Sequence, residues 1–187
     1  FPNNACPARE KTAMDASAAI EHACRHSRYL TRLLAAHPET AEALATTLQA
    51  HASAAVLEEW LSETPFDQCD ESALKSALRR LRARTMAHLI VRDLAGLADL
   101  DEVTEGMTLL AELTVRVAAD QARTVLVERF GEPRGEDGQV QPFICIGMGK
   151  LGGRELNVSS DVDFIFIYPE AGETDGETPT GDRKSVV

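Results

Sequence analysis

The fold of this chain is decided by the stretch Gly147-Met148-Gly149-Lys150-Leu151-Gly152-Gly153-Arg154-Glu155-Leu156-Asn157-Val158-Ser159-Ser160-Asp161-Val162-Asp163. The apolar residues 143–146 precede it, and turn signals on both sides of this run predict a buried strand. Residues 162–168 are rich in β-branched and aromatic side chains and end at Pro169, which predicts a second strand. The stretch is therefore a glycine-rich turn between two strands.

Two aspartates close this stretch. Asp161 and Asp163 stand two residues apart at the expected start of the second strand, so alternation should point both carboxylates to one face. Two like charges held that close oppose each other's ionisation, and a divalent cation removes the conflict. Mg²⁺ prefers carboxylate oxygens together with substrate phosphates. Two such ions can stabilise both the attacking and the leaving oxygen of a phosphoryl displacement. We therefore predict that both aspartates bind Mg²⁺ and are catalytic.

The glycines before the aspartates suit a phosphate. A glycine-rich turn after a strand lets backbone N–H groups approach phosphate oxygens closely, and Lys150 and Ser160 can add a cation and a hydroxyl. The predicted nucleotide- and phosphate-binding residues are Gly149, Lys150, Gly152, Gly153 and Ser160. The alternative is that the Asp-x-Asp pair merely caps a strand on a solvated edge. Its position between a glycine turn and a markedly apolar strand disfavours that alternative.

A dinucleotide-binding fingerprint can be excluded on spacing. Gly147-x-Gly149-x-x-Gly152 formally matches G-x-G-x-x-G after a strand. That fold then needs a crossover helix of about a dozen residues and an acidic residue about twenty positions on. Only residues 151–158 are available before the next strand, and the acidic residues arrive too early, as a pair.

Helical periodicity dominates the chain up to about residue 130. We expect a first helix that starts at Asp15 or Ser17 and ends before Pro38, because a proline disfavours helical backbone in the residue before it. Shorter helices are expected over residues 41–49 and 53–61.

Two longer helices should follow, one opened by Asp70 and one by Asp99 or Asp101. Each carries an apolar stripe, and their short connection predicts an antiparallel hairpin in a bundle. The polar, glycine-rich residues 131–138 mark a break, and the acidic residues 170–182 are expected to form a loop. The predicted class is α+β, with a helical region over residues 1–132 and the first strands of a second domain over residues 140–187.

Composition narrows the possible partners. The net charge of −11 argues against nucleic-acid binding, which needs clustered Lys and Arg. No segment approaches the ~20 apolar residues that span a bilayer, so no membrane partner is expected. The four cysteines lie far apart without a C-x-x-C pair, which favours reduced thiols and a cytoplasmic location. The chain starts at Phe1 without an initiator methionine and stops at Val187 without a finished domain edge, so we expect a fragment.

The decisive stretch resembles the polymerase-β-like nucleotidyltransferase superfamily, in which a Gly-[Gly/Ser] turn precedes Asp-x-Asp by roughly ten residues. Gly149-Lys150 and the aspartate pair fit this pattern, although Lys150 stands where Ser or Gly is usual. All of residues 147–163 resemble the signature of the glutamine synthetase adenylyltransferase/adenylyl-removing enzyme. Residues 147–150 and 157–161 are similar to its N-terminal, adenylyl-removing copy, with Val158 where an aromatic is common. The helical residues 36–39, 78–82 and 92–100 also resemble segments that precede that copy.

This resemblance implies a truncated polymerase-β-like domain and a reaction. Inorganic phosphate would attack the AMP–tyrosine bond of adenylylated glutamine synthetase, which gives ADP and free tyrosine. The implied partners are glutamine synthetase, ATP or ADP, phosphate and the PII signalling protein, with Mg²⁺ as cofactor. A third carboxylate from a later strand would lie beyond Val187, so we expect this piece alone to be inactive. Two alternatives stay open: the adenylylating copy, or a non-catalytic helical docking module with a nucleotidyltransferase remnant.

Other features have ordinary explanations. His22 and His26 are four residues apart on one helix but have no evident third ligand, so a solvated helix face is favoured over a metal site. The arginines between residues 79 and 84 are expected to form a salt-bridged surface. Trp60 is expected to be a packing residue.

Overall fold

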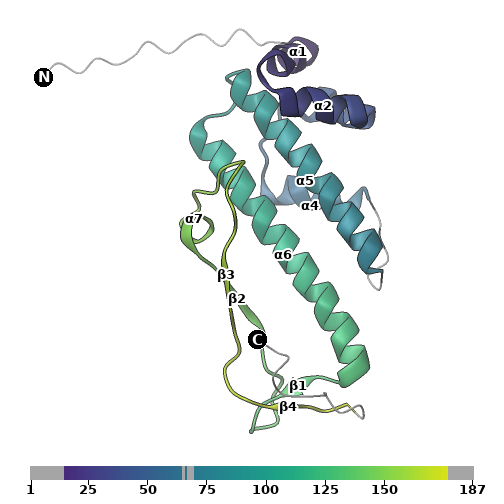
Figure 1. Cartoon of the computed structure of the whole chain (residues 1–187), viewed down its shortest axis with the longest axis vertical. Helices are drawn as coiled ribbons and strands as arrows, with labels where there is room; N and C mark the ends of the chain where they lie inside the picture. The colour runs from purple at the N-terminus through teal and green to yellow at the C-terminus, as the bar shows by residue number, and fades with distance from the viewer. Residues whose placement is uncertain (1–14, 65, 67–69, 177–187) are drawn as a thin grey trace, which may run out of the picture.

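The computed structural model describes residues 15–64, 66 and 70–176, and helices dominate this part of the chain (Figure 1). Six helices precede the strands, which are short and antiparallel. The predicted α+β class is confirmed. Among the described helices, none is both long and apolar enough to cross a membrane.

The first predicted helix is in fact two helices, α1 (Ala16–His26) and α2 (Arg28–Ala36). Ser27 separates them with an extended backbone, and its hydroxyl accepts a hydrogen bond from the N–H of Leu30 at 3.2 Å. A serine in this position caps a new helix because its side chain satisfies an amide that has no partner within the helix. The prediction of one uninterrupted helix was therefore wrong, whereas its end before Pro38 is confirmed.

Proline begins the next helix, α3 (Pro38–Thr47), at a position where a missing N–H costs nothing. The helices α4 (Ala54–Ser62), α5 (Glu71–Leu94) and α6 (Leu100–Phe130) follow. Each starts after a polar residue whose side chain accepts a hydrogen bond from the first turn, and these caps are Ser53, Asp70 and Asp99. The predicted starts of α4, α5 and α6 are confirmed, with Asp99 rather than Asp101 as the cap of α6, whereas α3 begins three residues before its predicted start at residue 41.

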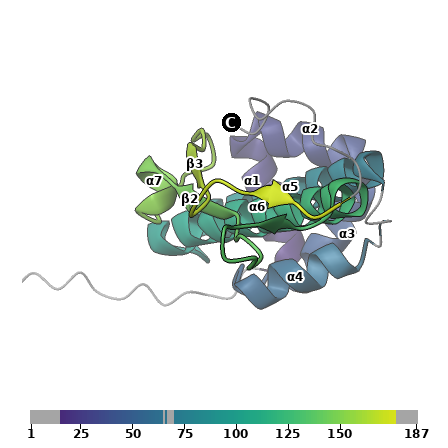
Figure 2. The ribbon, with the colours of Figure 1, turned by 90° about the horizontal axis from the view of Figure 1, so that it is seen from below.

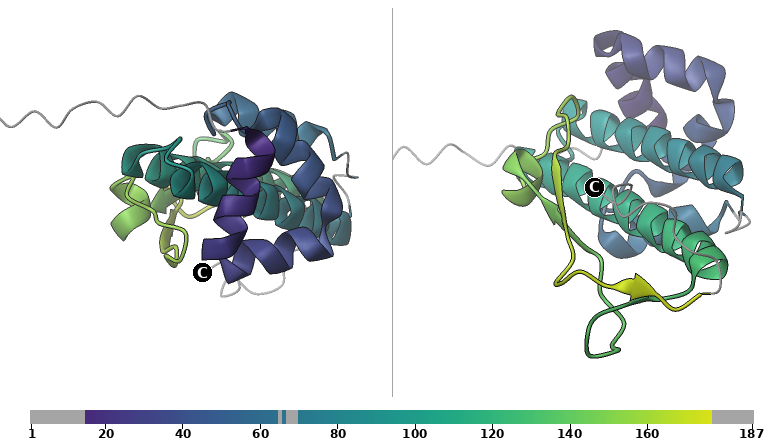
Figure 3. Two further views of the ribbon diagram at one scale, coloured as in Figure 1. Left: turned by 90° about the horizontal axis from the view of Figure 1, so that it is seen from above. Right: turned by 60° about the horizontal axis from the view of Figure 1, so that its bottom comes forward.

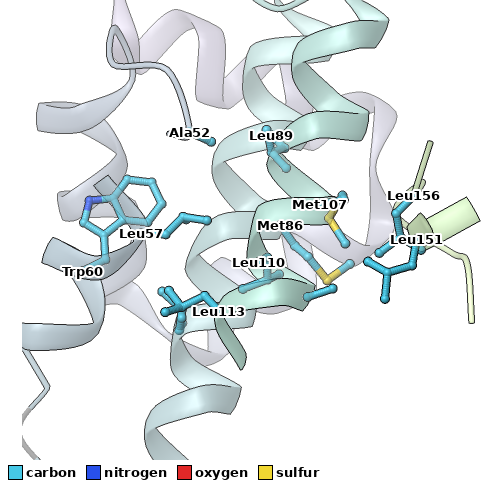
Figure 4. Close-up of a cluster of buried hydrophobic side chains, with 12 residues drawn as sticks. Ala52, Leu57, Trp60, Met86, Leu89, Met107, Leu110, Leu113, Leu151 and Leu156 are labelled. Carbon is cyan, nitrogen blue, oxygen red and sulfur yellow. The ribbon is translucent and has the colours of Figure 1, made fainter. Parts of the chain in front are cut away.

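The predicted hairpin of long helices forms the centre of the molecule. α5 and α6 pack along each other, and α1–α3 cover the end of α5 near the connection between the two long helices (Figures 1 and 3). Gly106 of α6 allows the close approach, because a Cβ there would lie 3.0 Å from the Leu89 side chain. Leu57 and Trp60 of α4 complete this core, which confirms Trp60 as a packing residue (Figure 4).

Within the predicted arginine surface, Arg84 makes both an ion pair and a contact with an aromatic ring. Its guanidinium pairs with Glu63 and lies 4.5 Å from the centre of the Trp60 ring. The long side chain of an arginine can cover an aromatic face while its charge stays paired. Arg84 therefore closes the solvent side of the Trp60 packing.

His88 is a buried titratable residue of this core. Its Nε2 donates to the backbone oxygen of Ala50 at 2.9 Å, and its ring contacts Trp60 edge-on at 5.1 Å. Burial lowers the pKa of His88 to about 4. The structure therefore holds the neutral imidazole, with the unprotonated Nδ1 lacking a hydrogen-bond partner among the described residues.

This burial predicts a pH-dependent stability. Between the ordinary histidine pKa of about 6.5 and the folded value of about 4, the unfolded chain binds a proton that the folded chain does not. The free energy of unfolding should therefore fall as the pH drops below about 6.5, by up to about 3 kcal/mol near pH 4. Urea unfolding of the wild type and of His88→Gln at several pH values measures the difference. Identical pH dependence in both proteins would contradict the prediction.

The strands form two separate pairs. β2 (Ile144–Gly147) pairs with β3 (Phe164–Ile167), and β1 (Pro133–Arg134) pairs with β4 (Glu173–Thr174). β4 lies within the predicted acidic loop, which is therefore partly a strand, and residues 177–182 of that loop lie outside the described residues. β2, β3 and α7 (Gly149–Gly152) lie along the side of α6 away from α5 (Figures 1 and 2).

The prediction of a buried strand over residues 143–146 was wrong. Phe143 is 58% exposed, and Ile144 and Ile146 are each 40% exposed. The apolar side chains of β3 are also largely exposed, with Phe166 at 59%. A strand is buried only when other strands or helices cover its faces, and a two-stranded sheet covers little. The local sequence therefore predicts the strand correctly, but it does not predict how far the strand is buried.

Candidate functional site

The pairing of β2 with β3 places the glycine turn beside the aspartate pair. The antiparallel register runs from Ile144 opposite Ile167 to Gly147 opposite Phe164. It continues for one more bond, because the N–H of Met148 donates to the backbone oxygen of Asp163 at 2.9 Å. The turn follows the end of β2, which lies beside the start of β3, and the two aspartates come just before that start. The two predicted halves of the site are thus neighbours in space.

The turn itself is a single helical turn, α7, that needs glycine at two positions. Gly149 has φ +54°, a left-handed backbone that side chains with a Cβ rarely adopt. A Cβ on Gly152 would lie 2.5 Å from the backbone oxygen of Gly147, which leaves no room for one. Gly153 is different, since a Cβ there would meet its nearest neighbour at an ordinary 3.4 Å.

These contacts predict different effects for two neighbouring glycines. Gly152→Ala should force the turn away from β2, whereas Gly153→Ala should leave it in place. Hydrogen exchange of the backbone amides of residues 151–156 is the measurement, with an increase of about tenfold or more expected for Gly152→Ala alone. Equal protection of these amides in the two variants would show that the close approach of Gly152 to Gly147 is unimportant.

The side chains of Lys150, in the turn, and Ser160, just before the aspartate pair, contact each other. The Lys150 ammonium donates to the Ser160 hydroxyl at 3.4 Å, and that hydroxyl donates to Oδ1 of Asn157 at 2.8 Å. The backbone N–H of Ser159 also donates to this oxygen at 3.1 Å. Two of the predicted phosphate-binding residues are therefore brought together by a third residue, Asn157. We had not predicted Asn157, although an asparagine just before two serines is a typical turn signal.

Asp161 and Asp163 are both exposed, and they lie just before β3 rather than within it. The prediction that β3 starts at residue 162 was wrong by two residues, since the strand pairing ends at Phe164. Strand alternation therefore does not by itself orient the two carboxylates. Within the described ranges, no three His, Cys, Asp or Glu side chains gather closely enough to hold a metal ion, and His22 and His26 have no further ligand there.

Two leucines hold this exposed site against the helices. Leu151 of α7 is 6% exposed and Leu156 is 2% exposed, and both join the core cluster that contains Met107 and Leu110 of α6 (Figure 4). Phe164 at the start of β3 packs against the same cluster. The site is thus fixed to the helical hairpin by apolar contacts on both sides of residues 152–155.

An arginine adds polar contacts between the site and α6. Arg154 donates from Nε and Nη2 to the two carboxylate oxygens of Glu105, at 3.0 and 2.6 Å, and from Nη1 to Glu112 at 2.8 Å. These hydrogen bonds hold the pKa of Glu105 below its ordinary value and raise the pKa of Arg154. No local sequence pattern indicates this pairing, because the partners are more than forty residues apart.

The two described cysteines, Cys24 and Cys145, are free thiols, and Cys6 and Cys69 lie outside the described residues. Neither described thiol lies in the predicted turn or beside the aspartate pair in the sequence. The structure therefore places no described cysteine among the candidate residues.

Comparison with known proteins agrees with the resemblance. The family model described as glutamate-ammonia ligase adenylyltransferase matches residues 17–186. Curated relatives named bifunctional glutamine synthetase adenylyltransferase/adenylyl-removing enzyme include those of Aromatoleum aromaticum, 46% identical over 158 residues, and Chromobacterium violaceum, 50% identical over 161 residues. A third, from Nitrosomonas europaea, is 46% identical over 165 residues.

The matches cover most of this chain and a small part of each relative. They span 84%, 86% and 87% of this chain, but 16%, 18% and 17% of the respective relatives. The family model alone covers well over half of the chain, and the identities are high enough to imply common descent. This chain belongs to the glutamate-ammonia ligase adenylyltransferase family.

Proposed function

We propose that this chain is the part of an adenylyl-removing enzyme that begins its nucleotidyltransferase site, with the nucleotidyltransferase portion starting near residue 140. The full-length protein would remove AMP from adenylylated glutamine synthetase by phosphorolysis. An oxygen of inorganic phosphate attacks the phosphorus of the AMP–tyrosine bond, the tyrosine oxygen leaves, and the products are ADP and tyrosine. The substrate is suggested by the names of the relatives, which include an adenylyl-removing activity.

One observation supports this proposal above the others. The β2–β3 pairing and the bond between Met148 and Asp163 set the glycine turn against the aspartate pair. Nucleotidyl transfer needs a group that binds phosphates next to a group that binds cations, because the reacting phosphates carry concentrated negative charge. Met148 and Asp163 lie fifteen residues apart in the sequence, and one short sheet makes the two groups neighbours.

The residues present fit a magnesium site as far as this chain extends. Asp161 and Asp163 offer exposed carboxylates, the ligand type that Mg²⁺ prefers, and leave coordination positions for substrate phosphates. When bound, Mg²⁺ would stabilise the charge on the attacking and leaving oxygens. A third protein carboxylate would have to come from residues beyond those described. ADP, ATP and the PII signalling protein belong to the same proposal as ligands and partner of the full-length protein.

The other site residues would act on the phosphates directly. The Lys150 ammonium and the Ser160 hydroxyl lie 3.4 Å apart, so one phosphate group could contact both. Gly149 has a left-handed backbone and no side chain, so a phosphate could approach the backbone of the turn closely there. These residues would bind and orient the phosphate that attacks, so that its oxygen approaches the phosphorus in line.

The adenylylating activity is the second candidate, because the relatives are named for both activities. It would use the same residues to attach AMP from ATP. A non-catalytic docking module is the third candidate, and the exposed apolar sheet favours it, since such surfaces often contact other chains.

The direction of the reaction can be tested with the full-length protein. Adenylylated glutamine synthetase and inorganic phosphate should yield ADP, and omission of phosphate should stop the release of AMP from tyrosine. Chromatographic separation of ADP from AMP, with mass spectrometry of the tyrosine peptide, measures both products. The 187-residue chain alone is expected to be inactive in this assay. Because the relatives are named for both activities, Asp161→Asn assigns the direction to this site: loss of phosphate-dependent removal alone supports the proposal, and loss of AMP attachment from ATP alone would assign the site to the opposite reaction.

A further inference from the structure

Arg154 connects the glycine turn to α6, because its backbone bonds to the turn and its side chain bonds to the helix. Its backbone N–H donates to the oxygen of Leu151 at 3.1 Å, and the next residue, Glu155, donates to the oxygen of Lys150 at 2.8 Å. Its guanidinium binds Glu105 with two parallel hydrogen bonds and Glu112 with a third. Any movement of this side chain along α6 would therefore be transmitted to the residues of the turn.

The backbone of Arg154 is unusual. Its φ of +58° makes it the one non-glycine residue with a positive φ among the described residues, and a left-handed backbone is strained for a side chain with a Cβ. Glycine or asparagine would adopt this conformation more easily. The position thus carries a long, paired cation where the backbone alone would favour a small residue. An arginine in this strained conformation indicates that its side chain has a specific role.

A contribution of these ion pairs to the stability of the whole fold does not explain the role of the Arg154 side chain. The side chains of Arg154, Glu105 and Glu112 are each close to half exposed, at 47%, 46% and 48%. Ion pairs at such positions stabilise a fold only slightly. Leu151 and Leu156 already fix the turn to the core, but apolar contacts do not set a direction. Hydrogen bonds to two glutamates two turns apart on α6 do set one.

We infer that Arg154 is a positioning residue, which uses Glu105 and Glu112 of α6 to hold Lys150 and the glycine turn against the aspartate pair. The inference rests on the proposed function of this site. A displacement of about 1 Å can cost about a hundredfold in rate when a reacting group is misplaced. Lys150 and Gly149 would contact the attacking phosphate, so the Michaelis constant for phosphate reports their position.

Arg154→Asn tests the inference in the full-length protein. Asparagine keeps the left-handed backbone and removes the contacts with α6. The KM for inorganic phosphate in the removal reaction should rise by about fivefold or more, whereas a lower folded fraction alone would reduce kcat without changing KM. The matched control is Arg116→Asn, which removes another exposed Arg–Glu pair of α6, with Glu58, and should change this KM by less than about twofold.

Glu105 supplies an independent check. Glu105→Gln should raise the phosphate KM as well, and combination with Arg154→Asn should add little, because both changes remove the same contact. Unchanged KM in Arg154→Asn, or fully additive effects in the double variant, would overturn the inference and leave the proposed function intact. Failure of the proposed function would look different, because the wild type itself would then release no ADP. In that case the same variants would be measured for hydrogen exchange of the amides of residues 149–156, and unchanged exchange in Arg154→Asn would overturn the positioning role independently of activity.

Discussion

Replacement of Asp161 or Asp163 by asparagine in the full-length protein is expected to reduce phosphate-dependent removal of AMP by about a hundredfold or more. Asparagine keeps the size of the side chain but removes the negative charge that a divalent cation requires. The proposed reaction concentrates charge on the transferring phosphate, so loss of the proposed Mg²⁺ would remove a large stabilising effect on the transition state. Initial rates of ADP release at saturating phosphate and Mg²⁺ measure the change.

Structural damage should not explain this loss, because both aspartates are exposed. Thermal unfolding of the variants should match the wild type within a few degrees. Asp120→Asn, at an exposed aspartate of α6 outside the site, is the matched control and should keep full activity. If the relatives' two activities use separate sites, attachment of AMP from ATP should also survive in the Asp161 variant. Removal activity within about threefold of wild type would exclude both aspartates as metal ligands.

Replacement of Arg92 by methionine is expected to lower the free energy of unfolding of the helical region by about 3–5 kcal/mol. Arg92 on α5 is only 2% exposed, and its Nε and Nη2 donate to the carboxylate of Glu102 on α6, at 2.6 and 3.0 Å. Its guanidinium also donates to the backbone oxygens of Leu48 at 2.6 Å and Leu97 at 3.2 Å. Without the guanidinium, the nearly buried carboxylate of Glu102 and the backbone oxygens of Leu48 and Leu97 lose their donor.

Denaturant unfolding of the 187-residue chain, followed by helical circular dichroism, measures this loss. The control is Arg25→Met, because Arg25 pairs with Glu21 on the surface of α1, with side chains 65% and 69% exposed. Removal of that pair should cost less than about 1 kcal/mol. Arg92→Lys should fall between the two, since lysine keeps the charge but cannot form the two parallel bonds to Glu102. A cost for Arg92→Met as small as that for Arg25→Met would show that Glu102 is satisfied without Arg92, for example by His51 at 3.1 Å.

The sequence was sufficient for features that depend on near neighbours. The caps Ser53, Asp70 and Asp99 each bond to an amide two or three residues away, so the residue type alone indicates the start of the helix. The same holds for the glycine turn, where Gly149 and Gly152 meet conditions set by their own segment. Family membership was also evident from residues 147–163, because that pattern is long and specific.

Predictions from local sequence were wrong where one sequence pattern is compatible with two structures. Ser27 lies in a run with continuous helical periodicity, and only the structure shows that it caps a second helix. Residues 143–146 have the apolar character of a buried strand, yet Phe143 is exposed because the described residues supply no further layer over that sheet. A hydrophobic pattern records which residues can be covered, whereas burial depends on what covers them.

The sequence by itself thus determined the starts of α4, α5 and α6, the glycine turn, the aspartate pair and the family of this protein, since each is encoded within a short stretch of consecutive residues. Only the tertiary structure decided that the turn and the pair meet at Met148 and Asp163, that β1 pairs with β4, and that Arg154 binds α6. These contacts join residues separated by fifteen to about fifty positions. The free energy of such contacts depends on how whole elements pack, and no short window of sequence contains that information.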